Sequence, residues 1–129
     1  MFGAIVFLGF ALESFINEVV NERCQDVFDS IEQIPLPDKW FIISKLSTKN
    51  ILQKNKEPFQ SIVLIFKLRN QLAHFKPKFM DYNAKSYQQM RKINHSVVKK
   101  LYNNSIEAMK LLAKEFNLEN QEWLEDKKL

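Results

Sequence analysis

A helical repeat of apolar residues near the end of the chain is the sequence feature that most restricts the fold. Its positions follow one another at steps of three and four residues: Met90, Ile93, Val97, Leu101, Ala108, Met109, Leu112 and Phe116, with Ser105 as the one weak position. This spacing predicts an amphipathic helix from about Lys85 to Asn117. The 129 residues include only 2 Gly and 4 Pro, which leaves little material for the tight turns that sheets need. We therefore expect an all-α fold.

Three further helices are predicted before this one. They cover about Phe2 to Val27, Lys39 to Leu46, and Pro58 to Ala73. Asp29 and Ser30 should begin a break after the first helix, and Asp38 is a suitable N-cap for the second. The expected architecture is an up-and-down helical bundle of four main helices. It forms one domain over residues 1–117, and residues 118–129 form a tail or a short helix.

The chain opens with twelve apolar residues, Met1 to Leu12. This run lacks the basic start and the small-residue cleavage site of a signal peptide, and it is shorter than the roughly 20 residues of a membrane span. We expect a helix buried in a core or a dimer interface, and no membrane partner. Cys24 is the only cysteine, so an intramolecular disulfide is impossible, which fits a reducing cytoplasm.

Charge is distributed unevenly along the chain. Residues 1–38 carry one basic and seven acidic side chains, residues 39–100 carry fourteen basic and two acidic, and residues 101–129 carry four basic and six acidic. The basic middle between acidic ends indicates a partner that bears phosphates, although a solvated basic surface would give the same pattern.

Arg69, Asn70 and His74 come together at the predicted end of the third helix, shortly before Pro77. Asn70 lies one turn before His74 on the same face. Each charged residue also has a structural explanation, since His74 can interact with the helix dipole and Arg69 can form an ion pair with another helix. His95 serves as a comparison, because its predicted position opposite Ile93 places it on a solvated helix face.

Glu13 supplies the context that an isolated arginine and histidine lack. It is the only charged residue among the first 17, and its helical neighbours include Gly9, Phe10 and Ile16. A carboxylate in so apolar a stretch must be exposed or paired, because burying it alone is unfavourable. Arg69 or the amide of Asn70 is the expected partner, which requires the first helix to pack on the third.

The segment Arg69-Asn70-Gln71-Leu72-Ala73-His74 resembles the motif of the HEPN superfamily, the higher eukaryotes and prokaryotes nucleotide-binding domains. Members of that superfamily are small helical bundles in which an arginine, often followed by a polar residue, precedes a histidine by a few positions. The trailing Phe75-Lys76-Pro77 and the first helix around Ala11 to Glu18 are also similar. The resemblance extends over about residues 1–117.

The resemblance implies a metal-independent endoribonuclease that acts without a cofactor. His74 would move the proton of the RNA 2′-hydroxyl or of the leaving oxygen, and Arg69 would hold the scissile phosphate. Asn70 would orient either His74 or the phosphate by a hydrogen bond. Arg69 and His74 would be about 140° and ~7.5 Å apart on one continuous helix, so two copies in a homodimer would build a composite site. The expected RNA contacts come from residues that flank the motif: Lys67, Lys76, Lys78, Phe75, Phe79 and Tyr82. The three aromatic residues can instead pack against the predicted fourth helix.

Such an enzyme would be an effector of a toxin–antitoxin or phage-defence system, restrained by an antitoxin or another regulatory protein. Two alternatives remain open. The chain can be a non-catalytic HEPN-like module that binds a nucleotide or braces a dimer, or a helical interaction domain that matches the motif by chance.

Overall fold

The computed structural model describes residues 2–23, 25–46, 52–73 and 92–116. Four helices of ten or more residues occupy most of these ranges: α1 (Phe2–Arg23), α3 (Leu36–Lys45), α4 (Phe59–Ala73) and α6 (His95–Glu115). A short 3-10 helix η1 (Gln25–Val27) and a single turn α2 (Phe28–Ile31) connect α1 to α3. No strand occurs in these ranges, so the predicted all-α bundle is confirmed.

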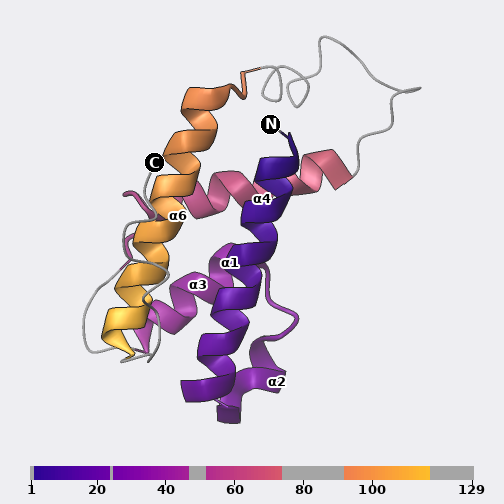
Figure 1. Ribbon diagram of the computed structural model, residues 1–129. Coiled ribbons are helices and arrows are strands. Elements are labelled where there is room, and N and C mark those ends of the chain that lie inside the picture. Colours follow the sequence, from indigo (N-terminus) through magenta and orange to yellow (C-terminus); the bar gives the residue numbers. More distant parts are fainter. Residues whose placement is uncertain (1, 24, 47–51, 74–91, 117–129) are drawn as a thin grey trace.

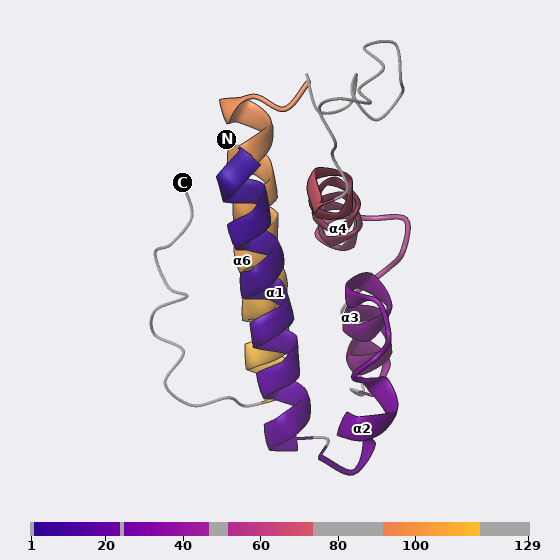
Figure 2. The same cartoon turned by 90° about the vertical axis from the view of Figure 1, so that its right-hand side faces the viewer.

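The helices form two layers with α1 in contact with every other long helix. α1 and α6 lie side by side and run in the same direction, and α4 crosses behind them (Figure 1). Seen from the side, α4 and α3 make up the second layer (Figure 2). α1 contacts α4, α6 and α3, and α4 also contacts α3 and α6. α4 therefore packs against each of the other three long helices.

The core lies where these helices meet. Trp40 of α3 is fully buried, stacks on Phe15 of α1 with ring centroids 5.7 Å apart, and donates from Nε1 to the carbonyl oxygen of Leu12 at 3.2 Å. The other buried apolar residues of α1 follow helical spacing, as expected for a core helix: Ile5, Leu8, Leu12, Ile16, Val19 and Val20.

α1 is also long and apolar enough to be compared with a membrane-spanning helix. It has 22 residues and a mean hydropathy of 1.6 over its most apolar stretch, so by length and composition alone it would suffice to cross a membrane. Its first twelve residues alone do not reach that length, but the whole helix does. Eight of its residues are buried in the bundle, and 44% of its most apolar stretch is buried.

Two predicted boundaries in the first half of the chain are wrong. The first helix stops at Arg23, and Asp29 and Ser30 lie in the turn α2 instead of a break. The second helix starts at Leu36, so Asp38 lies in its first turn and not at the N-cap. The cap position is Pro35, which makes no side-chain hydrogen bond to the helix. Prolines are compatible with a first helical turn because its N–H groups have no intrahelical acceptor.

The predicted start of the last helix, about Lys85, is also wrong, because α6 begins at His95. Asn94 has an extended backbone (φ −129°, ψ 179°), and its side chain accepts a hydrogen bond from the N–H of Val97 at 3.0 Å. This N-cap starts α6 at His95, so Ile93 lies before the helix. His95 is exposed as predicted, but because it is the first residue of α6 and not because it lies opposite Ile93 on one helix. The third helix, predicted from Pro58 to Ala73, begins one residue later, at Phe59.

Candidate functional site

Arg69 lies between α4 and α1, near the end of α4. Its Nη1 donates to Oε2 of Glu13 at 3.1 Å, so the predicted pair across the two helices is confirmed with Arg69, and not Asn70, as the donor to Glu13. The arginine side chain is 18% exposed and the glutamate side chain 40%. The pair is thus at the rim of the core, where water still reaches the carboxylate. A contact this exposed adds little stability, about 1 kcal/mol or less, but it fixes the direction of the arginine.

Gly9 makes the room that Arg69 occupies. A Cβ atom added to Gly9 would lie 2.7 Å from Cδ of Arg69 and 3.4 Å from its Nη1. Gly9 precedes Glu13 by one helical turn, so both residues face Arg69 from the same side of α1. Phe66, one turn before Arg69 on α4, places its ring 5.4 Å from the guanidinium carbon. Glycine, carboxylate and aromatic ring together form a slot for one arginine.

The arginine retains donors for a ligand. A guanidinium carries five N–H groups in a planar fork, and Glu13 occupies one nitrogen, Nη1. Neither Nε nor Nη2 forms a hydrogen bond with another residue in the described part of the chain. A positioned fork with unused donors is suited to a phosphate or a carboxylate.

The other predicted site residues divide into two groups. Asn70 is half-buried and Lys67 is exposed, and both lie on α4 in the turn that carries Arg69. The remaining ones lie outside the described residues: His74, Phe75, Lys76, Lys78, Phe79 and Tyr82. The structure therefore describes Arg69 and Asn70 of the motif, whereas His74 lies outside the described residues.

Sequence reasoning missed Gly9 and Phe66 as parts of the site. The signal for Gly9 was present, because a glycine inside a helix is less stable than alanine by about 1 kcal/mol and is retained where another group approaches closely. Phe66 gave no such signal, since an aromatic residue in an apolar helix is normally a core residue.

Not every basic side chain of the segment 39–100 lies at the surface. Lys39 is 2% exposed, and its Nζ donates to Oδ1 of Asn17 on α1 at 3.1 Å, so it is unavailable to a partner. Lys45 and Lys54 instead converge on Phe41, with their Nζ atoms 5.0 and 4.7 Å from the ring centroid. This second cluster lies at the other end of α4 from Arg69, because the ring of Phe41 contacts that of Phe59 at 5.7 Å.

A hydrogen-bonded cluster around Glu57 fixes the start of α4. Oε2 of Glu57 accepts from the N–H of Ser61 at 3.1 Å, from the Ser61 hydroxyl at 2.6 Å and from Nδ2 of Asn104 at 3.1 Å. Lys100 lies 3.9 Å from the other carboxylate oxygen. The cluster joins α4 to α6, and we interpret it as structural because each polar group is used within the bundle.

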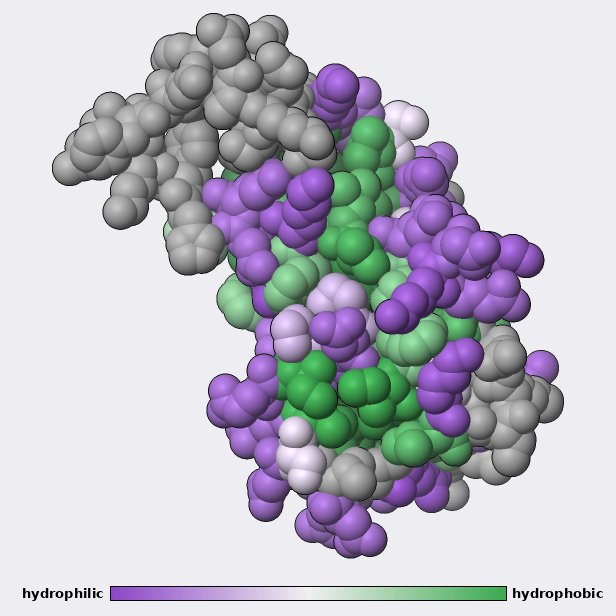
Figure 3. All heavy atoms as spheres, turned by 180° about the vertical axis from the view of Figure 1, so that it is seen from behind, coloured by the Kyte–Doolittle hydropathy of each residue, from purple (hydrophilic) through white to green (hydrophobic). Residues whose placement is uncertain are grey.

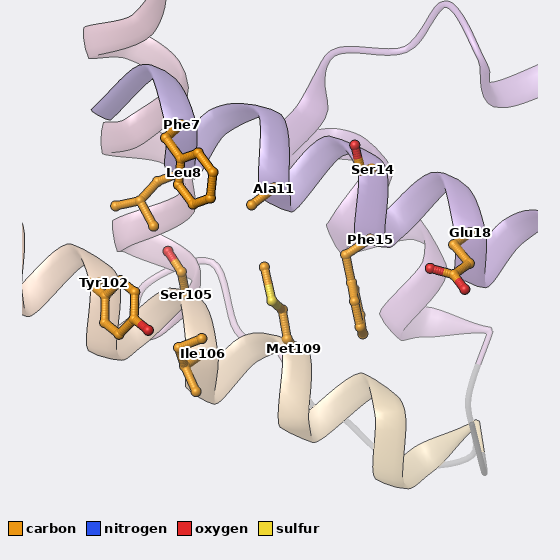
Figure 4. A pocket seen from close by; sticks show the side chains of 10 residues that line it. All are labelled: Phe7, Leu8, Ala11, Ser14, Phe15, Glu18, Tyr102, Ser105, Ile106 and Met109. Carbon is orange, nitrogen blue, oxygen red and sulfur yellow. The ribbon is translucent and has the colours of Figure 1, made fainter. Parts of the chain in front are cut away.

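An apolar groove of about 390 Å³ lies between α1 and α6. Leu8, Phe15, Ile106 and Met109 form its floor and sides, and Ser14, Glu18 and Tyr102 add polar atoms (Figure 4). Arg69 does not line it. The groove and the arginine slot are therefore separate features on either side of α1.

Exposed large apolar side chains are concentrated on the outer surfaces of three helices. On α1, Phe2, Phe7 and Phe10 are 45%, 68% and 60% exposed. The surface seen from behind shows apolar areas bordered by hydrophilic residues (Figure 3). Four large apolar residues of α3, its C-cap and α4 are exposed: Ile42, Leu46, Val63 and Leu64. Contiguous exposed apolar surface commonly marks an interaction site.

Among the described residues, no three side chains of His, Cys, Asp or Glu are grouped closely enough to hold a metal ion. Comparisons of the chain with protein-family models, with curated proteins and with solved structures found no match. Its function must be argued from its own residues and from the motif resemblance.

Proposed function

We propose that the protein is a metal-independent endoribonuclease of the HEPN type. The observation that carries the proposal is the position of Arg69, whose guanidinium is oriented by Glu13, Gly9 and Phe66 and keeps Nε and Nη2 for a ligand. Three residues from two helices orient one arginine, and that arginine is the first residue of the motif. An oriented guanidinium with donors left at Nε and Nη2 is suited to binding the scissile phosphate.

In the proposed reaction, the RNA 2′-oxygen attacks the adjacent phosphorus and the 5′-oxygen of the next nucleotide leaves. His74 takes the proton of the 2′-hydroxyl or gives one to the leaving oxygen. Arg69 stabilises the charge that develops on the phosphate, and Asn70 orients the histidine or the phosphate by hydrogen bonding. The products are a 2′,3′-cyclic phosphate and a 5′-hydroxyl.

Flanking residues would hold the strand without reading its sequence. Lys67, Lys76 and Lys78 would contact backbone phosphates, and Phe75 and Tyr82 would stack on unpaired bases. Of these residues, Lys67 is exposed on α4, as that role requires.

A homodimer is part of the proposal, since two copies would supply two arginines and two histidines to one composite site. The exposed phenylalanines of α1 support such an assembly. Phe7 and Phe10 are among its most exposed apolar residues, and Phe10 precedes Glu13 by three positions, so it lies close to the arginine slot. An apolar surface beside a polar site is well placed to join two copies around that site.

In the cell, such a nuclease would act as a toxin or a phage-defence effector, in the cytoplasm, and an antitoxin or another regulatory protein would restrain it. This assignment follows from the resemblance alone.

One observation favours a second candidate, a non-catalytic HEPN-like module. The side chain of Arg69 is only 18% exposed and already paired, as expected of an arginine that joins two helices. In that case the motif would bind a nucleotide or brace a dimer.

Cleavage of single-stranded RNA in the presence of EDTA separates the two candidates. The wild type should cut, and Arg69→Ala and His74→Ala should each abolish cutting while the far-ultraviolet circular dichroism spectrum is retained. His95→Ala is the matched control, because His95 is exposed at the start of α6, and it should cut like the wild type. The fragments should carry 5′-hydroxyl ends that polynucleotide kinase labels without prior dephosphorylation. Absence of cutting by the wild type, or equal cutting by His74→Ala, would exclude the nuclease.

A further inference from the structure

The apolar groove between α1 and α6 takes no part in the proposed RNA cleavage. Leu8, Phe15, Ile106 and Met109 form its floor and sides (Figure 4). At about 390 Å³ it is near the small end of the range for ligand pockets, ~300–1,000 Å³. A space of this size suits a few large side chains better than a folded partner.

The two edges of the groove carry opposite charges. On the α1 edge, Glu18 lines the groove and is exposed. On the α6 edge, Lys110 follows Ile106 by one helical turn and Lys114 follows Lys110 by another, so both lysines share a side of α6 with Ile106. Neither lysine forms a salt bridge with any residue in the described ranges, and Glu107, the acid that precedes them on α6, has an interaction partner of its own. An occupant that is apolar on one side and acidic on the side facing α6 therefore matches the groove.

The segment that follows α6 has the composition of such an occupant. Residues 117–129 lie outside the described residues, and their sequence places Trp123 and Leu124 between acids on both sides. The acids are Glu119, Glu122, Glu125 and Asp126, and two lysines, Lys127 and Lys128, follow them. An indole brings a large apolar area and an N–H group that needs an acceptor when it is buried. The carboxylate of Glu18 and the hydroxyl of Ser14 are acceptors in the lining of the groove.

The length of the chain permits this contact. Phe116 is the C-cap of α6, and Met109 precedes it by seven residues, about 10 Å along the helix axis. Trp123 follows Phe116 by another seven residues, which span up to ~23 Å when extended. The segment can thus turn back along α6 and bring Trp123 to the end of the groove formed by Phe15, Glu18 and Met109. The phenylalanines proposed for the homodimer lie toward the other end.

We propose that residues 117–129 dock in the groove between α1 and α6 of the same chain, with Trp123 on its apolar floor and the flanking acids against Lys110 and Lys114. Burial of the indole provides most of the affinity, because ion pairs at an exposed edge contribute little. The charges set the direction in which the segment lies. Docking of the segment does not depend on RNA cleavage, and its tests do not measure cleavage.

Acrylamide quenching of tryptophan fluorescence in the full chain measures the docking. Trp40 is fully buried and poorly reached by the quencher, so the quenchable emission comes from Trp123, and Trp123→Phe identifies its share. If the segment is docked about nine-tenths of the time, Trp123 should be quenched about tenfold less than in a free peptide of residues 117–129. Equal quenching of Trp123 in the chain and in the peptide would overturn the proposal.

Charge reversal tests the edge of the groove. Lys110→Glu with Lys114→Glu should raise the quenching of Trp123 about 3-fold or more, while the far-ultraviolet circular dichroism spectrum is retained. Adding Glu122→Lys and Glu125→Lys to the same chain should restore the protection, which a merely structural effect of the first two changes would not allow.

The matched control for charge is Lys56→Glu with Lys67→Glu, since both lysines are exposed outside α6 and the net charge changes equally. It should leave the protection of Trp123 unchanged. Equal loss of protection in the control, or full protection in Lys110→Glu with Lys114→Glu, would refute the contact with α6. Ala11→Leu fills the lining of the groove and should also raise the quenching, and unchanged protection in this variant would place the segment outside the groove.

Two measurements identify the chain to which the bound segment belongs. Docking within one chain gives a protection of Trp123 that is independent of protein concentration, whereas protection that rises with concentration would assign the segment to a second copy and overturn the proposal. A labelled peptide of residues 117–129 should bind full-length Trp123→Ala about tenfold more tightly than the wild type, because the wild-type segment already occupies the groove. Equal binding of the peptide to both proteins would contradict docking within the chain.

Discussion

Replacing Gly9 by alanine should push the Arg69 side chain out of its position between α1 and α4. The added Cβ would lie 2.7 Å from Cδ of the arginine, closer than side-chain contacts allow. The guanidinium cannot retreat freely, because its Nη1 is bound to Glu13 and it lies over the ring of Phe66. The arginine must therefore either leave the pair or adopt an unfavourable rotamer.

The free energy of unfolding should change by the difference of two effects. Alanine is favoured over glycine inside a helix by about 1 kcal/mol, and Gly9 has no positive φ that alanine would strain. Against this stand about 1 kcal/mol or less for the partly exposed ion pair and ~0.5–1.5 kcal/mol for an off-rotamer arginine. The net change in the wild-type background should lie between about 0.5 kcal/mol of stabilisation and about 1.5 kcal/mol of destabilisation.

A double-mutant cycle with Arg69→Ala separates these effects. Without the arginine there is nothing to clash with, so Gly9→Ala should then stabilise by about 1 kcal/mol, and the coupling between the two positions should be about 0.5–2.5 kcal/mol. Urea unfolding followed by circular dichroism measures all four proteins. Gly3→Ala is the control, because a Cβ added there meets no atom within 4 Å, and its effect should be the same in both backgrounds. Equal stabilisation by Gly9→Ala with and without Arg69 would show that the arginine does not occupy this slot.

Two further predictions concern the surface and the core. Phe7→Ser with Phe10→Ser should shift the protein toward a monomer in sedimentation experiments, because both side chains are largely exposed on α1. The same change at Val63 and Leu64 should leave the mass unaltered, and a monomeric wild type at micromolar concentration would contradict the composite site. Trp40→Phe should lower the free energy of unfolding by about 1–3 kcal/mol, since it removes the hydrogen bond to Leu12 and leaves a cavity in a fully buried site. Ile42→Ala, at an exposed position of the same helix, should change it by less than ~1 kcal/mol in the same urea experiment.

The helix ends show where local sequence falls short of the structure. Periodicity identified the helix over residues 58–73 to within one residue, because the apolar pattern begins directly after the turn that ends at Pro58. The start of the last helix was misplaced because the spacing of Met90 and Ile93 continues the pattern of α6, while Asn94 caps the helix and excludes them. A short polar side chain such as that of Asn94 can bond to the backbone and start a helix at a point that the apolar spacing alone does not reveal.

The sequence by itself determined the helical class and indicated that Glu13 needs a partner on the third helix, with Arg69 and Asn70 as the two candidates. Both follow from local rules, since apolar spacing defines a helix face and a lone carboxylate in an apolar stretch needs a partner. Only the tertiary structure decided where the basic side chains of this region lie. Lys39 turns inward to Asn17, Lys45 and Lys54 meet at Phe41, and Arg69 occupies the space left by Gly9. Those positions depend on how α1, α3 and α4 cross, and the crossing is set by packing between residues that are distant in sequence.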